Sequence, residues 1–160
     1  MVIILMGVTG SGKTTIGLAL AASLQWRIVD ADDFHSPSNV AKMRAGVPLD
    51  DADRLPWLTS LHDAIDGWLE AGTNVVLACS ALKQSYREQL LVSPDVKLVY
   101  LRGSRELISQ RLSQRHGHYM NSNLLASQFA ALEEPRDAVV ANIDRDVPDI
   151  VDHIRKALSI

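Results

Sequence analysis

The sequence predicts a three-layer α/β/α fold in which helices cover both faces of a five-stranded parallel sheet. Short apolar runs alternate along the 160 residues with longer segments of helical periodicity. The runs are rich in valine, isoleucine and leucine, as strands buried on both faces are. A glycine-rich segment joins the first run to the first helical segment. A chain of this length can bury a complete core, so we expect one domain over residues 1–160.

The glycine-rich segment, GVTGSGKT at Gly7–Thr14, fits the pattern G-x-x-x-x-G-K-[ST] of a phosphate-binding loop. Glycines let the backbone curl around phosphate oxygens, and the N–H groups of the loop and of the helix start point at the negative charge. We expect Lys13 to reach the β- and γ-phosphates of a nucleotide and the Thr14 hydroxyl to hold Mg²⁺. The expected nucleotide-binding residues are Gly7, Val8, Thr9, Gly10, Ser11, Gly12, Lys13, Thr14 and Thr15.

The remaining elements follow from apolar runs and from the residues that begin and end helices. The expected strands are Met1–Met6, Trp26–Val29, Asn74–Cys79, Val96–Leu101 and Val139–Ile143. Capping residues and prolines predict where several helices begin, and glycines where two of them end. The first helix is expected after Thr14, over the apolar run Ile16–Leu24. Further helices are expected from Pro37 to Gly46 behind Ser36, from Pro56 to Gly72, from Leu82 to Leu91, behind Ser104, from Leu124 to Leu132 and from Pro148 to Leu158, with a loop over Pro48–Arg54.

Composition excludes several classes of function. A net charge of -3 argues against a general nucleic-acid or membrane-surface role. No run approaches the ~20 apolar residues of a membrane span, and no basic segment precedes the apolar start. The single cysteine, Cys79, cannot form an intrachain disulfide. We therefore expect a cytoplasmic protein whose partner is a small molecule.

Polar residues follow several strands at the edge where open α/β sheets bind ligands. Asp30 and Asp32 follow the second strand, Ser80 and Lys83 the third, and Arg102 the fourth. Carboxylates beside a phosphate loop can hold Mg²⁺, directly or through water, or accept the proton of an attacking hydroxyl. We assign Asp30 to Mg²⁺ and Asp32 to the hydroxyl, although the sequence allows the two roles to be exchanged.

Three arginines, Arg105, Arg111 and Arg115, precede a strongly polar break in the pattern at 115–123. A spacing of four places Arg111 and Arg115 on one helical face. Arginines of this kind reach the transferring phosphoryl group from a closing lid, so we expect a lid at about 111–123 with Arg111 and Arg115 as catalytic residues. His116 and His118 lack a cysteine or carboxylate at ligand spacing, which argues against zinc.

These stretches together resemble the gluconate kinase (gluconokinase) family along nearly the whole chain. The most specific stretch is DADDFHSPSNVAKMRAGVPLDDADRLPWL, from Asp30 to Leu58. CSALK at Cys79–Lys83, followed by Tyr86-Arg87, resembles a second signature of the family. RHGHYM at 115–120, with Leu124-Leu125 and Ser127-Gln128-Phe129 after it, resembles its lid and the next helix. Two departures are Ser36, which stands between His35 and Pro37, and Tyr119, which is often phenylalanine.

The resemblance implies a P-loop kinase fold similar to nucleoside monophosphate kinases, a homodimer, and transfer of the ATP γ-phosphate to the 6-hydroxyl of D-gluconate. A polyhydroxy acid needs a cation for its carboxylate and several hydrogen-bonding groups for its hydroxyls. The candidates over the sheet are His35, Arg54, Ser80, Lys83 and Arg87. Trp57 and Trp68 could stack a ligand or pack in the core.

Two other functions remain open from the sequence. One is a related small-molecule kinase for shikimate, a nucleotide or adenylylsulfate, which would share the fold and differ at the acceptor site. The other is a nucleotide-dependent switch. The Asp-x-x-Gly and Asn-Lys-x-Asp motifs of a GTPase are not found in the sequence.

Overall fold

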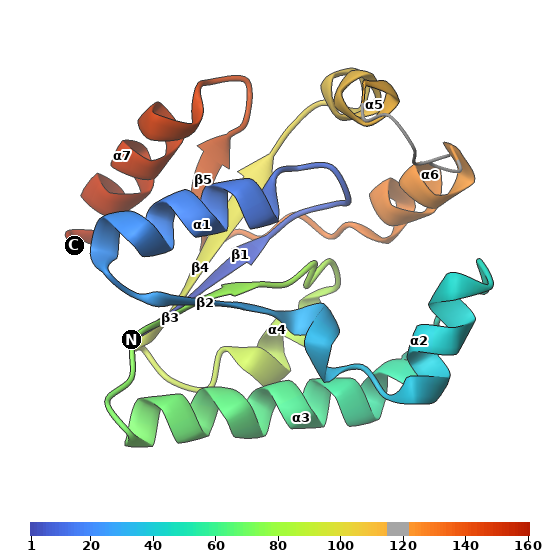
Figure 1. The fold of residues 1–160 in the computed structure, drawn as a ribbon, viewed down its shortest axis with the longest axis horizontal. Helices are drawn as coiled ribbons and strands as arrows, with labels where there is room; N and C mark the ends of the chain where they lie inside the picture. The colour runs from blue at the N-terminus through green and yellow to red at the C-terminus, as the bar shows by residue number, and fades with distance from the viewer. Residues whose placement is uncertain (115–121) are drawn as a thin grey trace.

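The centre of the molecule is a parallel five-stranded sheet with the strand order β2-β3-β1-β4-β5 (Figure 1). The computed structural model describes residues 1–114 and 122–160. The strands are β1 (Val2–Met6), β2 (Arg27–Asp30), β3 (Val75–Ala78), β4 (Val96–Arg102) and β5 (Val139–Asn142). The predicted sheet is confirmed.

Helices cover both faces of the sheet, as predicted (Figure 1). They are α1 (Lys13–Leu24), α2 (Pro37–Arg44), α3 (Asp51–Glu70), α4 (Gln84–Leu90), α5 (Arg105–Ser113), α6 (Ser122–Ala131) and α7 (Val147–Leu158), with a short 3₁₀ turn η1 (Ala31–Phe34). The helices α1 and α7 lie on one face, and α3 and α4 lie on the other. No helix among residues 1–114 and 122–160 is long and apolar enough to cross a membrane.

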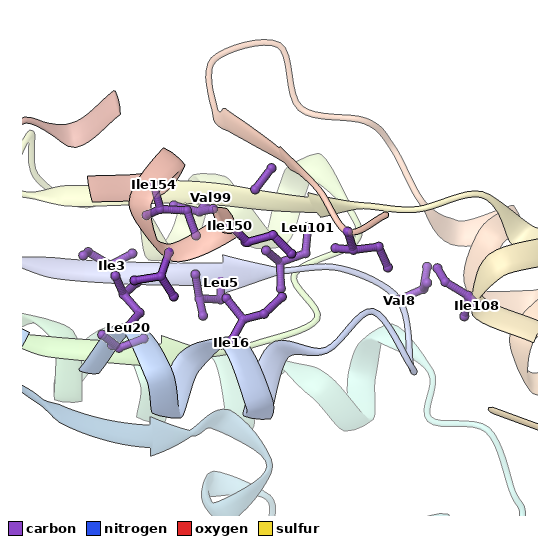
Figure 2. Close-up of a cluster of buried hydrophobic side chains, with 14 of the residues drawn as sticks. Ile3, Leu5, Val8, Ile16, Leu20, Val99, Leu101, Ile108, Ile150 and Ile154 are labelled. Carbon is purple, nitrogen blue, oxygen red and sulfur yellow. The ribbon is translucent and has the colours of Figure 1, made fainter. Parts of the chain in front are cut away.

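The central strand β1 divides the core into two layers. Ile3 and Leu5 face a cluster that contains Ile16 and Leu20 of α1 and Ile154 of α7 (Figure 2). Val2, Ile4 and Met6 face the second cluster, which contains residues of α3 and α4. All five residues of β1 are buried, so this strand is the rigid support for the loop that follows it.

Helix α3 begins earlier than the sequence predicted. The prediction of a loop over Pro48–Arg54 with a helix opening at Pro56 is wrong at this point, because α3 begins at Asp51 and contains Pro56. The Asp50 carboxylate accepts a hydrogen bond from Asp53 N at 2.7 Å, and Asp53 accepts one from Asp50 N at 3.1 Å. This capping box satisfies two helix-end amides, and the acidic residues suit the positive end of the helix. Pro56 then lies in the second turn of the helix.

The predicted capping serines are confirmed. Ser36 Oγ accepts a hydrogen bond from Asn39 N at 3.2 Å, and Ser104 Oγ accepts one from Leu107 N at 3.1 Å.

The order of the strands explains where the site forms. After β1, the chain continues to β2 and β3 on one side of β1 and then to β4 and β5 on the other. The loop after β1 therefore lies at the point where the strand order reverses, which is the ligand-binding position of open α/β sheets.

Candidate active site

The phosphate loop runs from the end of β1 to the start of α1 and depends on glycine at two tight positions. Gly10 and Gly12 have φ angles of +77° and +93°, a conformation that other residues adopt only with strain. A Cβ atom at Gly10 would also lie 2.8 Å from the Leu112 side chain of α5. Loop and helix therefore approach so closely that only glycine fits.

Lys13 lies inside this loop. Its Nζ donates to the carbonyl oxygens of Gly7 at 3.0 Å and of Val8 at 3.1 Å. Burial lowers the pKa of Lys13, and the negative charges of Asp32 and Asp30 counteract part of that effect. The ammonium group thus lies between its own loop and the carboxylates that follow β2, as a cation that neutralises a transferring phosphoryl group must.

The loop fits the phosphates of a nucleoside triphosphate. Within the described residues, Ser11 Oγ is buried and has no hydrogen-bond partner. The exposed residues Thr14 and Thr15 begin α1, where backbone N–H groups and the helix dipole favour an anion. A buried polar atom without a partner, a cation and a helix start therefore converge on one loop, which is the donor set that phosphate groups require.

Asp30 and Asp32 lie at the carboxyl end of β2, which β3 separates from β1 and its phosphate loop. Asp30 Oδ1 accepts a hydrogen bond from Asp32 N at 3.0 Å and caps the turn η1. The Asp32 side chain is 78% exposed, but its surroundings remove part of its hydration. This desolvation raises the pKa of Asp32, and the neighbouring charge of Asp30 raises it further. The Asp32 carboxylate is therefore more basic than an ordinary aspartate.

His35 is held in a defined orientation, and its side chain is 5% exposed. Its ring stacks on Trp57 with 4.6 Å between the ring centroids, and Trp57 Nε1 donates to the Ala31 carbonyl at 2.7 Å. Asn39 Nδ2 lies 3.3 Å from His35 Nδ1 and donates to the Asp53 carbonyl at 2.8 Å. Because an amide nitrogen only donates, Nδ1 accepts and the proton is on Nε2, which lies 4.0 Å from Asp32 Oδ1. Burial lowers the pKa of His35, which favours this neutral form.

Two of the expected substrate cations meet at Tyr86. Arg54 Nη1 lies 3.4 Å from Tyr86 Oη, and Lys83 Nζ lies 5.5 Å from the centroid of the Tyr86 ring. Lys83 also donates to both carboxylate oxygens of Asp51, at 2.8 and 3.1 Å, and the Tyr86 hydroxyl donates to the same carboxylate. The Lys83 contact, and then that of Tyr86, lowers the pKa of Asp51. The start of α3 and the start of α4 are thus joined by one polar cluster, Asp51, Arg54, Lys83 and Tyr86.

Arg87, the third expected cation, is used inside the protein. Its guanidinium is 2% exposed and donates to the carbonyls of Ala81 at 3.0 Å and Leu82 at 2.9 Å and to Gln84 Oε1 at 2.8 Å. These contacts organise the loop after β3, which carries Ser80 and Lys83. Ser80 accepts a hydrogen bond from Gly7 N at 3.3 Å through its backbone carbonyl, so this loop touches the phosphate loop.

The two arginines that were expected to be catalytic have different outcomes. Arg111 is half-buried on α5 and donates through Nη2 to the carbonyl of Ile143, just after β5. Arg115 lies outside the described residues, as does the part of the expected lid at 115–121, with His116 and His118. Their roles stay predictions.

Sequence reasoning gave no role to three residues of this site. Asp51 and Tyr86 stand within longer sequence motifs and had no predicted role of their own. An acid three residues before Arg54, at a helix start, could have indicated a partner for a nearby cation. Gln128 also stands within such a motif, and its contact with Thr9 N at 2.5 Å spans 119 residues. No local pattern predicts such a pair.

A parallel sheet whose first strand leads into a phosphate loop, with strand-end carboxylates beside the loop lysine, defines a P-loop kinase. A family model described as an AAA domain matches residues 2–138. The probable gluconokinase of Mus musculus is 43% identical, and the match covers 98% of this chain and 97% of that protein. The chain therefore belongs to the gluconokinase family.

A further relative and a solved structure agree with this assignment. The gluconokinase of Gluconobacter oxydans (strain 621H) is 44% identical over 93% of this chain and 85% of its own. The crystal structure of a gluconokinase from Sinorhizobium meliloti 1021 matches with a TM-score of 0.88 at 37% identity, over 98% of this chain and 90% of that one. Shikimate kinase from Bacteroides thetaiotaomicron has a TM-score of 0.69 at 18% identity, a likeness of fold alone.

Proposed function

We propose that this chain transfers the γ-phosphate of ATP to the 6-hydroxyl of D-gluconate, giving 6-phospho-D-gluconate and ADP. The observation that carries the proposal is the juxtaposition of Lys13 with Asp30 and Asp32 at one edge of the sheet. Relatives named gluconokinase that match nearly the whole chain support the choice of acceptor.

The donor side of the reaction is assigned to the phosphate loop. Loop N–H groups and the start of α1 bind the phosphates, and Lys13 neutralises charge as the phosphoryl group moves. Lys13 must exchange the Gly7 and Val8 carbonyls for phosphate oxygens. An anionic oxygen is a stronger hydrogen-bond acceptor than a carbonyl, which favours this exchange.

Mg²⁺ is assigned to the Thr14 hydroxyl and to Asp30. The described residues contain no group of three His, Cys, Asp or Glu side chains that could hold a metal by themselves. That composition suits Mg²⁺ in a kinase, which is bound by one or two protein oxygens together with phosphates and water. When bound, the ion would neutralise part of the negative charge of the phosphates.

The acceptor hydroxyl is assigned to Asp32. Its raised pKa makes it a better proton acceptor than an ordinary aspartate, and its carboxylate faces the opening of the site. His35 Nε2 lies 4.0 Å from the same carboxylate, which is too far for a direct hydrogen bond. As the hydroxyl oxygen attacks the γ-phosphorus, Asp32 accepts or orients its proton.

The acceptor carboxylate is assigned to Arg54 and Lys83, the two cations that contact Tyr86. Arg87 supports this site indirectly, because its hydrogen bonds to the Ala81 and Leu82 carbonyls order the loop that carries Ser80 and Lys83. An analogue without the carboxylate forms no charge-assisted hydrogen bonds with these cations and binds more weakly. Glucose should therefore be a poor acceptor.

The test is a coupled assay of ADP release against gluconate, glucose, shikimate and a nucleoside monophosphate. Gluconate should give the highest kcat/KM. Arg54→Ala should raise the KM for gluconate far more than the KM for ATP, whereas exposed Arg136→Ala should change neither. Preference for shikimate or a nucleoside monophosphate would overturn the proposed acceptor. The proposed Mg²⁺ requirement predicts loss of activity with EDTA, and sedimentation velocity tests the homodimer that the family resemblance suggests.

A further inference from the structure

Gln128 of α6 makes a direct contact with the phosphate loop that the assigned functions do not use. Its Oε1 accepts a hydrogen bond from Thr9 N at 2.5 Å across 119 residues of sequence. Both residues are half-buried. A neutral side-chain oxygen thus binds the loop on which the phosphates of the nucleotide are expected.

The packing of α6 explains how Gln128 reaches the loop. Leu125, one turn earlier on α6, is 6% exposed and belongs to the same buried cluster as Val8 and Leu112. Residues three apart lie on one helical face, so burial of Leu125 turns Gln128 toward the loop. The ribbon shows α5 and α6 near the end of the loop, which curves between them and α1 (Figure 1).

One peptide unit links Gln128 to Lys13. Thr9 N and the Val8 carbonyl belong to the same peptide group, and in a trans peptide these two dipoles point in opposite directions. The N–H donates to Gln128, while the Val8 oxygen accepts from Lys13 Nζ at 3.1 Å. Rotation of this peptide would break both contacts at once. Gln128 therefore fixes the orientation of the carbonyl that holds the catalytic ammonium.

We propose that Gln128 is a positioning residue for nucleotide binding, which acts by fixing the Val8–Thr9 peptide and thereby the backbone of the phosphate loop. The inference concerns the same site as the proposed function and rests on it for the binding of ATP at this loop. With Gln128 present, the loop meets the triphosphate in a fixed conformation. Without this acceptor, Thr9 N–H loses its partner and the loop must be ordered when the nucleotide binds, which weakens binding.

The test compares Gln128→Met, which removes the acceptor at similar volume, with Gln128→Glu, which keeps an acceptor oxygen. The control is Gln110→Met, an exposed glutamine on α5. Calorimetric titration with ATP alone should show about tenfold weaker binding for Gln128→Met, the factor that one ordinary hydrogen bond supplies. Gln128→Glu adds a negative charge beside the phosphates, so it is compared by exchange of the Thr9 amide and not by ATP affinity, and Gln110→Met should match the wild type. The KM for gluconate should stay unchanged in all three.

Hydrogen exchange of the Thr9 amide gives a readout that a general loss of stability would not reproduce. The amide should be protected in the nucleotide-free wild type and in Gln128→Glu, and should exchange faster in Gln128→Met while neighbouring core amides stay protected. Unchanged ATP affinity in Gln128→Met, faster exchange of the Thr9 amide in Gln128→Glu than in the wild type, or an unprotected Thr9 amide in the wild type would each overturn the proposal. If Gln128→Met does not fold, the wild-type exchange and Gln128→Glu decide. A wild type that binds ATP but does not phosphorylate gluconate would contradict the proposed acceptor and leave this test intact.

Discussion

Replacement of Arg87 by leucine separates a structural role from a substrate-binding role. The buried guanidinium donates to the Ala81 and Leu82 carbonyls and to Gln84. The Leu82 oxygen keeps a second donor, Glu133 N at 2.9 Å, and thus loses an ordinary hydrogen bond of about 1 kcal/mol. The Ala81 carbonyl loses its donor and stays buried away from water, which costs about 2 kcal/mol. We therefore expect a loss of about 3 kcal/mol in the free energy of unfolding.

That loss corresponds to a Tm lower by about 6–12 °C for a chain of this size. Thermal unfolding followed by circular dichroism measures it. The exposed Arg136→Leu is the matched control and should shift Tm by no more than about 2 °C, as for an ordinary surface substitution. An Arg87→Leu variant that melts with the control but has a strongly raised KM for gluconate would refute the structural role. If Arg87→Leu is insoluble, Arg87→Lys should fold with a lowered Tm, because it keeps the charge and loses the planar fork.

Three further predictions follow from the charged groups of the site. Lys13→Ala should nearly abolish phosphotransfer and leave the circular dichroism spectrum unchanged; activity within about tenfold of wild type would contradict the role of this lysine. Asp32→Asn should lower turnover by ~10²-fold, and its Tm at pH 7 should be equal or higher, because the raised pKa of Asp32 means that folding disfavours its charged form. The difference in Tm between Asp32→Asn and wild type should disappear at a pH below the ordinary aspartate pKa. A Tm of Asp32→Asn below that of wild type at pH 7 would contradict a raised pKa for Asp32. For His35, whose pKa is lowered, the stabilising contribution is present above the ordinary histidine pKa of about 6.5 and is lost as the pH falls below it. His35→Gln should therefore show a smaller fall in Tm than wild type between about pH 7.5 and pH 5.5, and equal slopes would argue against a buried neutral histidine.

Much of the fold could be predicted because its signals are local. The apolar run of β1 gives a buried strand, and the loop motif gives the turn that follows it. Ser36 and Ser104 cap helices as expected because an N-cap needs only an oxygen near an amide three residues away. The start of α3 was wrong because two local signals compete there. The capping box of Asp50 and Asp53 determines the start, although Pro56 is also common at the first position of a helix.

The partners of the site residues could not be predicted because they depend on tertiary packing. The sequence placed Lys83 and Arg87 at one strand end with the same chemistry, yet Lys83 is one-third exposed beside Asp51 and Arg87 is buried under the loop. Lys83 is the N-cap of α4 and Arg87 lies four positions later in that helix, and the packing of α3 against α4 decides which of them faces the opening. The contact between Thr9 and Gln128 depends in the same way on the packing of Leu125.

Within residues 1–114 and 122–160, the cations assigned to the site have hydrogen-bond partners in the protein itself. Lys13 contacts two loop carbonyls, Lys83 contacts Asp51, and Arg111 contacts the Ile143 carbonyl. Binding of a triphosphate and a sugar acid is therefore an exchange of hydrogen bonds, and its net free energy is smaller than a count of new contacts suggests. The exchange favours ligands whose oxygens carry more charge than the carbonyls they replace. At Lys83 the resident partner is itself a carboxylate, so an incoming carboxylate gains little there unless Arg54 also binds it. Selection of a sugar acid should therefore depend more on Arg54, whose contact in the described residues is the neutral Tyr86 hydroxyl, than on Lys83.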